Sequence, residues 1–351
     1  MIPGPSRGNP RAVEIVGGGL AGLGLGLALC RAGIPAAVFE THAYPRHRVC
    51  GEFLTGLDPV TIARLGLAPL LRDALRHHHV AWYRHGRPVR RHRLPLPALG
   101  LSRYVLDARL AEAFTAAGGV LRTGVRVSPD AAPPGRVLAV GRRRRPSPWL
   151  GLKVHACGLR LGADLEVHLG DHAYVGLAGV EGGRVNVCGL FCRQPDAPES
   201  GAGPGPAALL RHLEGAGLGD LARRLEAAEL DASSFSAVAA LSFRPARPEP
   251  GRISLGDSLA MTPPFTGNGM AMALQSAALA VEPLSAWARG GREWAQAVEA
   301  TNRRLWRRFR TRLVSASLLH PFLLKSPLQS WLAFASRTRL LPLRPLYQLT
   351  H

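Results

Sequence analysis

Three closely spaced glycines follow the first apolar segment of the sequence. Gly17, Gly19 and Gly22 form a GxGxxG pattern between the apolar run 13–16 and the Leu- and Ala-rich run 20–32. Glycines at these positions permit a tight turn, let the backbone approach a pyrophosphate, and let a helix pack closely on a strand. The free N–H groups at the start of that helix then face the phosphates. The segment therefore predicts strand, phosphate-binding turn and helix.

An acidic residue ends the next predicted strand. Residues 36–39 are apolar, and Glu40 follows them 18 residues after Gly22. In dinucleotide-binding folds an acid at this place accepts hydrogen bonds from the ribose hydroxyls. A lone GxGxxG has little specificity, whereas strand, glycines, helix, strand and terminal acid together predict a Rossmann-type nucleotide site.

A second glycine motif occurs late in the chain, in the segment 255–274, LGDSLAMTPPFTGNGMAMAL. Asp257 follows a short apolar strand, where a carboxylate can bind a polyol hydroxyl. Gly267 and Gly269 let the backbone approach a ring, and the helix that they open directs N–H groups at it. This arrangement stabilises negative charge on a bound ring system.

The two motifs at this separation resemble the FAD-binding pattern of the flavoprotein class shared by aromatic hydroxylases and geranylgeranyl reductases. The segment 102–110, SRYVLDARL, adds an arginine followed by an Asp-headed helix, and the segment 47–54, HRVCGEFL, looks most like the geranylgeranyl-reductase branch. The resemblance covers most of residues 13–290 and implies a set of FAD contacts. The expected contacts are Gly17, Gly19, Leu20, Ala21, Gly22, Glu40, Thr41, Arg48, Cys50, Gly51, Arg103, Val125, Gly256, Asp257, Pro264, Gly267, Asn268, Gly269 and Met270.

Two positions differ from the aromatic hydroxylases. Those enzymes usually carry a His three residues after the Asp of the second motif, where this chain has Ala260. They also carry an Asp-Gly in a middle motif, where the nearest match here is Val140-Gly141. The tryptophan motif typical of flavin halogenases is absent. The missing His, together with the segment 50–53, CGEF, favours the reductase branch. The missing acid in the middle motif argues against direct reduction by NAD(P)H, which stays one candidate electron donor.

Cys50 and Glu52 are the predicted catalytic residues. A thiol or carboxylic acid beside a flavin can protonate a substrate carbon while the flavin supplies hydride. The alternative is structural: Cys50 is a small buried hydrophobic residue, and Glu52 pairs with an arginine. No metal site is predicted, because Cys188 and Cys192 lie in a strand-like run and the consecutive residues 77–79, all histidines, cannot share one face.

The sequence therefore predicts an FAD-dependent oxidoreductase that transfers hydride to or from a carbon–carbon double bond. The expected substrate is small and lipophilic, of polyketide or isoprenoid type. One alternative is a monooxygenase that hydroxylates an aromatic or quinone-like ring through a flavin hydroperoxide. An alternative of another class is a non-catalytic flavin-binding or lipid-carrying protein.

The elements that position these residues indicate an α/β fold with a split Rossmann-type FAD-binding domain, an inserted antiparallel substrate sheet and a helical C-terminal region. The expected FAD-binding segments are 10–75, 102–150 and 251–290. The expected substrate-domain segments are 76–101 and 151–250, and the helical region is 291–351. Within them, helices are predicted at 59–75, 106–117, 207–215, 217–229 and 267–289, and strands at 120–127, 137–140, 164–169, 173–178 and 185–191.

The chain is strongly basic, with a formal net charge of +20, and all but two of its 44 basic residues are arginine. These arginines are spread along the chain without a nucleic-acid motif, so nucleic acid is an unlikely partner and anionic substrates or lipid surfaces are favoured. The five cysteines show no framework spacing and no signal peptide precedes them, which favours the cytoplasm. Residues 310–351 mix apolar and basic residues, which predicts either a peripheral membrane contact or a cap over the substrate cavity.

Overall fold

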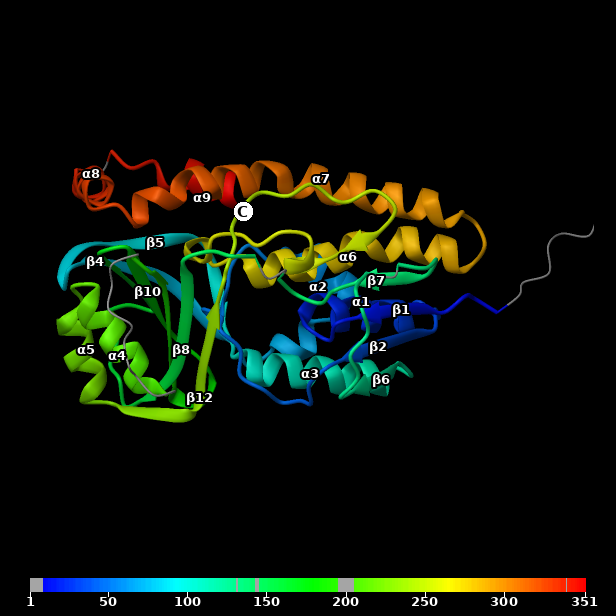
Figure 1. The fold of residues 1–351 in the computed structure, drawn as a ribbon, viewed down its shortest axis with the longest axis horizontal. Coiled ribbons are helices and arrows are strands. Elements are labelled where there is room, and N and C mark those ends of the chain that lie inside the picture. The colour runs from blue at the N-terminus through cyan, green and yellow to red at the C-terminus, as the bar shows by residue number, and fades with distance from the viewer. Residues whose placement is uncertain (1–8, 131, 143–144, 195–204, 339) are drawn as a thin grey trace, which may run out of the picture.

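The structure is a computed structural model that describes residues 9–130, 132–142, 145–194, 205–338 and 340–351. Two sheets lie side by side, and a long pair of helices runs along one edge of the half that contains the parallel sheet (Figure 1). The half on the right of Figure 1 is a parallel sheet covered by helices, and the half on the left is a larger, mostly antiparallel sheet. The predicted fold class is thereby confirmed.

The parallel sheet has the strand order β13-β7-β1-β2-β6. All four pairings are parallel. Parallel sheets are usually buried on both faces, and their strands consist of short apolar runs. The same holds here, because Val13, Ile15, Val38 and Ile253 are 0% exposed. Its strands are β1 (Val13–Val16), β2 (Ala36–Glu40), β6 (Val120–Thr123), β7 (Arg136–Leu138) and β13 (Ile253–Ser254).

Helices cover this sheet and hold its motifs in place. The helix α1 packs against both α3 and α6, and nearly all of its residues are buried. Gly24 in α1 permits this approach, because a Cβ there would already touch Leu274 of α6 at 3.4 Å. The helices of this half are α1 (Leu20–Arg31), α2 (Pro59–Leu65), α3 (Arg103–Ala116) and α6 (Gly269–Ala288).

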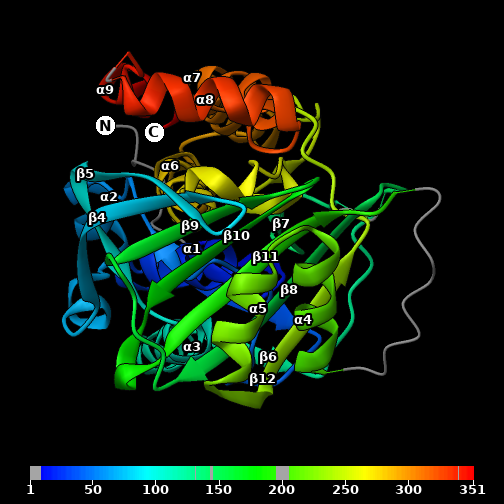
Figure 2. The same ribbon diagram turned by 90° about the vertical axis from the view of Figure 1, so that its left-hand side faces the viewer.

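The second sheet has the order β12-β8-β11-β10-β9-β4-β5-β3, and all its pairings are antiparallel except β4 with β9. The short helices α4 and α5 lie over its outer face, in front of the sheet in Figure 2. The strands are β3 (Phe53–Leu54), β4 (Leu75–Arg84), β5 (Arg87–Gly100), β8 (Trp149–Cys157), β9 (Leu165–Gly170), β10 (Ala173–Gly179), β11 (Val185–Cys192) and β12 (Glu229–Ala239), and the helices are α4 (Pro206–Gly215) and α5 (Gly219–Glu226).

Several predicted element boundaries were wrong. The helix predicted over 59–75 ends at Leu65, because Gly66 adopts a left-handed conformation with φ of 67° and stops it. The helix predicted at 106–117 begins three residues earlier, because the hydroxyl of Ser102 caps it by accepting a hydrogen bond from the Val105 N–H at 3.1 Å. The predicted strands 120–127 and 137–140 end earlier, at Thr123 and Leu138.

Five strands were not predicted at all, among them the two-residue strand β3. β4 and β5 occupy the His- and Arg-rich stretch, which was expected to be irregular, and β8 and β12 flank the predicted sheet strands. Strands β5 and β12 are largely exposed or half-buried, so they lack the apolar alternation on which the prediction depended. The domain boundaries themselves stay a proposal.

The C-terminal region is helical, as predicted. The helices α7 (Trp294–Leu319), α8 (Ser326–Arg337) and α9 (Leu343–Thr350) follow α6, and α7 packs along it (Figure 1). In the described part of the chain, no helix combines the length and apolar character needed to cross a bilayer.

One buried ion-pair cluster in the second sheet makes a testable contribution to stability. Burial opposes ionisation of Glu166, but hydrogen bonds from His168, Arg224 and the Gly162 N–H outweigh it and lower the pKa from about 4.5 to about 2. A lowered pKa stabilises the folded state above the unfolded value and is lost as the pH falls through the folded value. We therefore expect the unfolding free energy to fall between pH 4.5 and 2, and to fall less steeply in Glu166→Gln. Urea unfolding at several pH values in this range measures the free energy. An equal dependence of the unfolding free energy on pH in the two proteins would contradict the prediction.

Candidate cofactor site

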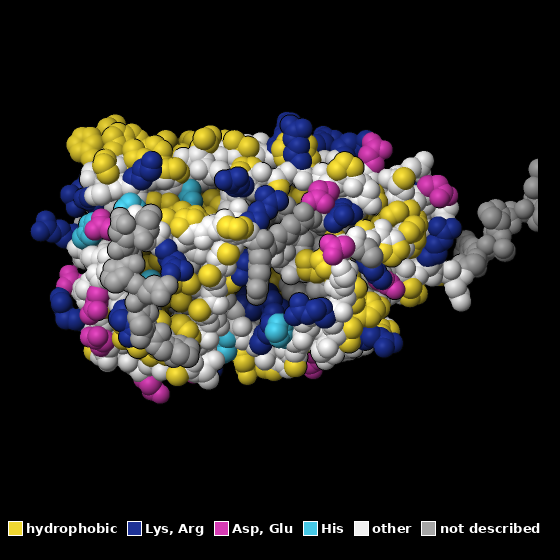
Figure 3. Space-filling model, in the orientation of Figure 1, with side chains coloured by type: hydrophobic (Ala, Val, Ile, Leu, Met, Phe, Trp, Pro, Cys, Tyr) yellow, Lys and Arg dark blue, Asp and Glu magenta, His cyan; other side chains and the backbone are white. Residues whose placement is uncertain are grey.

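One large cavity of about 1460 Å³ lies where the carboxyl ends of the parallel strands meet the second sheet. Ligands of open α/β sheets bind at this edge. Of the nineteen predicted FAD contacts, all except Gly22 and Asn268 line this cavity. Strongly basic side chains gather around the hollow between the two halves in the space-filling view (Figure 3), and those that line the cavity are all arginines.

The first glycine motif forms the turn that its spacing predicts. Gly17 has φ of +107°, and a Cβ there would overlap the carbonyl oxygen of Ala139 and lie 2.7 Å from the Val140 nitrogen. Gly19 precedes α1 without any side-chain cap, so the N–H groups of the first turn remain available to a ligand. Gly22 does not line the cavity, because it packs against the Gly17 carbonyl. The turn therefore fits a pyrophosphate.

Glu40 lies at the end of β2, beside this turn. Its carboxylate accepts hydrogen bonds from the N–H of Gly18 at 2.9 Å and of His42 at 3.1 Å. Burial opposes its ionisation, but Arg48 and the Gly18 N–H together lower the pKa of this carboxyl. An ionised acceptor at this position suits ribose hydroxyls.

Arginines form much of the charged lining. Arg103 donates to both oxygens of the buried Asp107, at 2.7 and 2.8 Å, and Arg48 donates to the same carboxylate at 3.2 Å. Asp107 therefore fixes two cations that face the cavity. Six arginines line the cavity against three acids: Arg46, Arg48, Arg103, Arg126, Arg142 and Arg252 against Glu40, Asp130 and Asp257. This balance suits a ligand with two phosphates.

The second motif forms the opposite wall. Asp257 follows β13 and faces the cavity, where burial raises the pKa of its carboxyl against the opposing charges of Arg103 and Arg142. Ser258 Oγ accepts from the Gly141 N–H at 3.0 Å and donates to the Gly141 carbonyl at 3.1 Å. The middle segment, although it lacks an acid, is thus joined directly to the second motif.

Asn268 was a predicted FAD contact, but in the structure it serves another purpose. It is fully buried and does not line the cavity, its amide donates to the Thr350 carbonyl, and its oxygen accepts from Thr266 at 2.8 Å. Tyr347 also hydrogen-bonds to Thr55 at 2.9 Å. The helix α9 is therefore held against the second motif.

The two predicted catalytic residues have different positions. Cys50 lines the cavity, and burial raises the pKa of its thiol, so that the protonated form is favoured. Glu52 is 0% exposed and does not line the cavity. Its carboxylate contacts His155 Nε2 at 2.6 Å and Lys153 Nζ at 3.4 Å, and accepts from the Arg103 N–H at 3.0 Å. The partner expected for Glu52 was an arginine side chain, and the structure places a lysine and a histidine there instead.

Several cavity residues were not predicted. Arg46 and His47 precede Arg48 in the loop after β2, and Arg126 follows β6. Their position in the sequence could have identified them, because loops that follow neighbouring parallel strands meet at the same edge of the sheet. The residues from β12 and beyond, Ser236, Ala237, Val238, Leu241, Met261 and Thr262, form the remaining wall, and no motif marks them.

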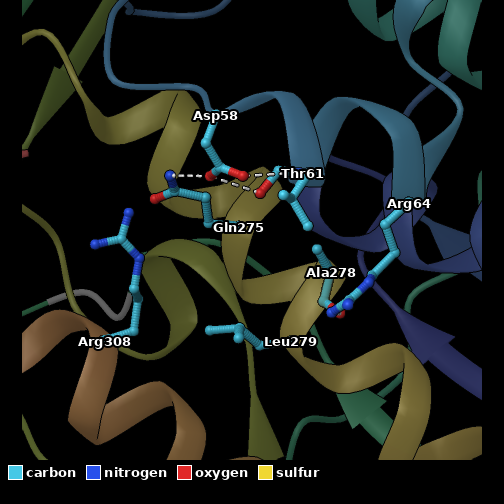
Figure 4. Close-up of a pocket in the computed structure, with 8 residues that line it drawn as sticks. Asp58, Thr61, Arg64, Gln275, Ala278, Leu279 and Arg308 are labelled. Atoms are coloured by element: carbon cyan, nitrogen blue, oxygen red, sulfur yellow. Dashed lines mark hydrogen bonds between the residues drawn. The ribbon is translucent and has the colours of Figure 1, made fainter.

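A second hollow of about 200 Å³ lies between α2, α6 and α7 (Figure 4). Its carboxylate is already paired: Asp58 accepts from the Thr61 N–H at 2.8 Å and from Gln275 Nε2 at 2.9 Å. Arg64 reaches along its wall to the Ala278 carbonyl at 3.4 Å. Asp58 thus caps α2, and Arg64 ties α2 to α6. The hollow shares no lining residue with the cofactor cavity.

Comparison with known proteins gives one relative by sequence and many by structure. No family model matches the chain. A segment is 30% identical over 127 residues to menaquinone reductase of Mycolicibacterium smegmatis, covering 34% of this chain and 30% of that protein. The match therefore spans less than a third of that relative's length.

Two solved structures share the fold along nearly the whole chain. HpxO of Klebsiella pneumoniae, complexed with FAD and uric acid, has a TM-score of 0.73 at 17% identity, covering 97% of this chain and 96% of HpxO. The p-nitrophenol 4-monooxygenase PnpA of Pseudomonas putida has a TM-score of 0.72 at 16% identity, covering 97% of both chains. The protein thus has the fold of these proteins. HpxO binds the cofactor that the sequence predicts here.

Proposed function

We propose that this protein is an FAD-dependent oxidoreductase acting on a small, lipophilic substrate. One observation carries the proposal: glycines of both motifs, among them Gly17 and Gly267, which lie 250 residues apart, line a single cavity of about 1460 Å³. Pockets for one small molecule commonly measure about 300–1,000 Å³. The cavity therefore has room for a dinucleotide and a substrate together.

The residues present fit FAD in a defined order. Gly17, Gly19 and the start of α1 would hold the pyrophosphate, Glu40 the ribose of the adenosine half, and Asp257 the polyol chain that joins the pyrophosphate to the flavin ring. The start of α6, at Gly267 and Gly269, would stabilise negative charge on the reduced ring. When bound, FAD supplies hydride transfer or oxygen activation. Around it the chain binds and orients the substrate and excludes water with apolar side chains of the β12 wall.

We favour hydroxylation of an aromatic or quinone-like ring over the double-bond reduction first expected from the sequence. Support comes from PnpA, a monooxygenase of this fold, and from HpxO, which binds the aromatic compound uric acid beside FAD. Reduction is the second candidate, favoured by the protonated Cys50 thiol in the cavity and by the sequence match to a quinone reductase.

The test is oxygen uptake by the FAD-loaded protein with NADPH or NADH and a panel of alkylphenols and quinones. Hydroxylation predicts substrate-dependent oxygen consumption in step with an oxygenated product. Anaerobic turnover of a quinone without oxygen consumption would replace hydroxylation by reduction. Failure to bind FAD after reconstitution would overturn the proposal as a whole.

For the reductive reaction, Cys50→Ala is expected to slow the anaerobic reoxidation of dithionite-reduced flavin by a quinone about a hundredfold, because the variant lacks the thiol proton donor. Stopped-flow absorbance of the flavin measures this rate. Reoxidation of the reduced flavin by oxygen in the same variant is the control, because no organic substrate is protonated in that reaction. Equal slowing of both rates would assign Cys50 to flavin placement rather than proton donation.

We also propose that the C-terminal helices contact an anionic bilayer surface. Residues 300–351 contain ten Lys or Arg residues and no Asp or Glu. Six apolar side chains of this C-terminal region are unusually exposed, and apolar surface gathers over α8 at the upper left of Figure 3. They are Val314 (45%), Leu318 (69%), Trp331 (56%), Phe334 (61%), Leu340 (70%) and Leu349 (46%). Such a patch with basic flanks fits anionic lipid headgroups and the acyl boundary beneath them.

The double variant Trp331→Ser/Phe334→Ser is expected to lose most binding to phosphatidylserine vesicles, because it removes the two aromatic side chains from the patch. Co-sedimentation with vesicles measures the bound fraction, and pure phosphatidylcholine vesicles test the charge requirement. Leu96→Ser is the matched control, since Leu96 is 58% exposed on β5, outside this patch. If the double variant and the control bind phosphatidylserine vesicles to the same extent, the membrane proposal is wrong.

A further inference from the structure

A cluster of nitrogen and oxygen donors lies at the rim of the cofactor cavity, outside both glycine motifs. His47, His155 and Asp231 each offer one donor atom, and these atoms lie within 4.8 Å of one another. They come from three separate segments: the loop after β2, the middle of β8 and the edge strand β12. His47 also lines the cavity. The fold therefore brings together donors that the sequence keeps far apart.

His155 provides a second, independent observation. Its side chain is 1% exposed, and its Nδ1 is buried with no hydrogen-bond partner among the described residues. Its other nitrogen, Nε2, is held by the Glu52 carboxylate at 2.6 Å. A buried ring nitrogen without a partner carries a desolvation cost that a bound ligand can remove. A histidine whose far nitrogen is held by a carboxylate is the usual arrangement behind a metal ligand.

Asp231 completes the donor set. One of its carboxylate oxygens accepts from the Ser233 N–H at 3.0 Å and from the Ser233 hydroxyl at 2.6 Å, which fixes the orientation of the group. Glu52 and Asp231 bring two negative charges to this corner of a chain with a net charge of +20, and Lys153 brings one positive charge. A divalent cation is therefore favoured here electrostatically.

We propose that His47, His155 and Asp231 form a binding site for one Zn²⁺ ion, in place of the absence of metal predicted from the sequence. Two imidazoles and a carboxylate are a common zinc donor set, with the fourth position open to water. Lys153 now donates to His47 Nδ1 at 3.1 Å. On binding of zinc this hydrogen bond is given up, and Lys153 keeps Glu52 as its partner.

The consequence of zinc binding is a cross-link over the cavity rim. It ties the loop of residues 41–52, which carries Arg48 and Cys50, to strands β8 and β12 of the second sheet. Zinc should therefore raise the melting temperature of the FAD-loaded protein as well as bind to it, since a ligand that binds only the folded state stabilises it.

The experiment is calorimetric titration of Zn²⁺ into the chelator-treated, full-length, FAD-loaded protein, followed by thermal melts with and without zinc. We expect one ion per chain and a higher melting temperature. Asp231→Asn should weaken binding by about a hundredfold and abolish the thermal shift, while the amide keeps the turn to Ser233. His85→Gln is the matched control, because His85 lies 3.6 Å from Asp171 and belongs to no group of three donors among the described residues.

Two outcomes would overturn the zinc site. One is zinc affinity in Asp231→Asn equal to that of the unaltered chain. The other is a crystal structure of the zinc-soaked protein with only a water molecule beside His155 Nδ1. Both readouts are independent of catalysis, so they distinguish failure of the zinc site from failure of the proposed oxidoreductase activity.

Discussion

Replacing Gly17 by alanine is expected to raise the Kd for FAD by about a hundredfold, equal to about 2.8 kcal/mol. The new Cβ would overlap the carbonyl oxygen of Ala139 and lie 2.7 Å from the Val140 nitrogen. Both are backbone atoms at the end of β7, so no side chain can rotate to make room. The turn must therefore open and move away from the pyrophosphate. Quenching of flavin fluorescence on titration with the apoprotein measures the Kd.

A second glycine separates this effect from general backbone strain. Gly33 also has a positive φ, of +72°, but a Cβ there meets nothing within 4 Å. Gly33→Ala should therefore lose some stability and keep wild-type affinity for FAD. If the two variants bind FAD equally well, Gly17 has no special part in the phosphate turn. Circular dichroism shows whether each variant is folded before the affinities are compared.

The second large effect concerns stability. Glu52→Gln is expected to lower the free energy of unfolding by about 3–5 kcal/mol, because it leaves a buried cation without its counter-charge. Lys153 and Glu52 are both 0% exposed, with Nζ and Oε1 3.4 Å apart. The amide of glutamine can replace the shape of the carboxylate but not its charge. Urea unfolding at saturating FAD measures the difference.

The matched control for this variant is Glu299→Gln. Glu299 pairs with Arg303 on the surface of α7, with the two side chains 71% and 61% exposed. Exposed pairs of this kind contribute little, so the control should unfold close to the unaltered protein. Similar losses in both variants would mean that the buried carboxylate network does not stabilise the fold.

The sequence predicted the residues of the cavity near the glycine motifs better than those of its other walls, for a physical reason. The phosphate turn depends on Gly17, Gly19 and Gly22, whose roles are set by backbone conformation within six residues of chain. Glu40 could be assigned to the same site because parallel neighbouring strands end at the same edge of the sheet, which brings the end of the second strand beside the turn. These requirements are local, so the pattern of residue types is enough to reveal them.

The surroundings of Glu52 could not be found in that way. Its partners, Lys153 and His155, lie two residues apart on β8 and so point to the same face of the sheet. Whether that face meets Glu52 depends on the register and packing of a strand about 100 residues away in sequence. The same limit hid the role of Asn268, whose partner Thr350 belongs to the last helix.

The last strand of the parallel sheet has a consequence for synthesis of the protein. β13 pairs with β7, yet more than a hundred residues separate them in the chain, and five of the eight strands of the second sheet, β8 to β12, lie between them. At a translation rate of about 5–20 residues per second, the nascent nucleotide-binding half exposes an open apolar sheet edge for several seconds. Fragments that end before residue 253 should aggregate, and slower translation should increase the dependence of the full chain on chaperones.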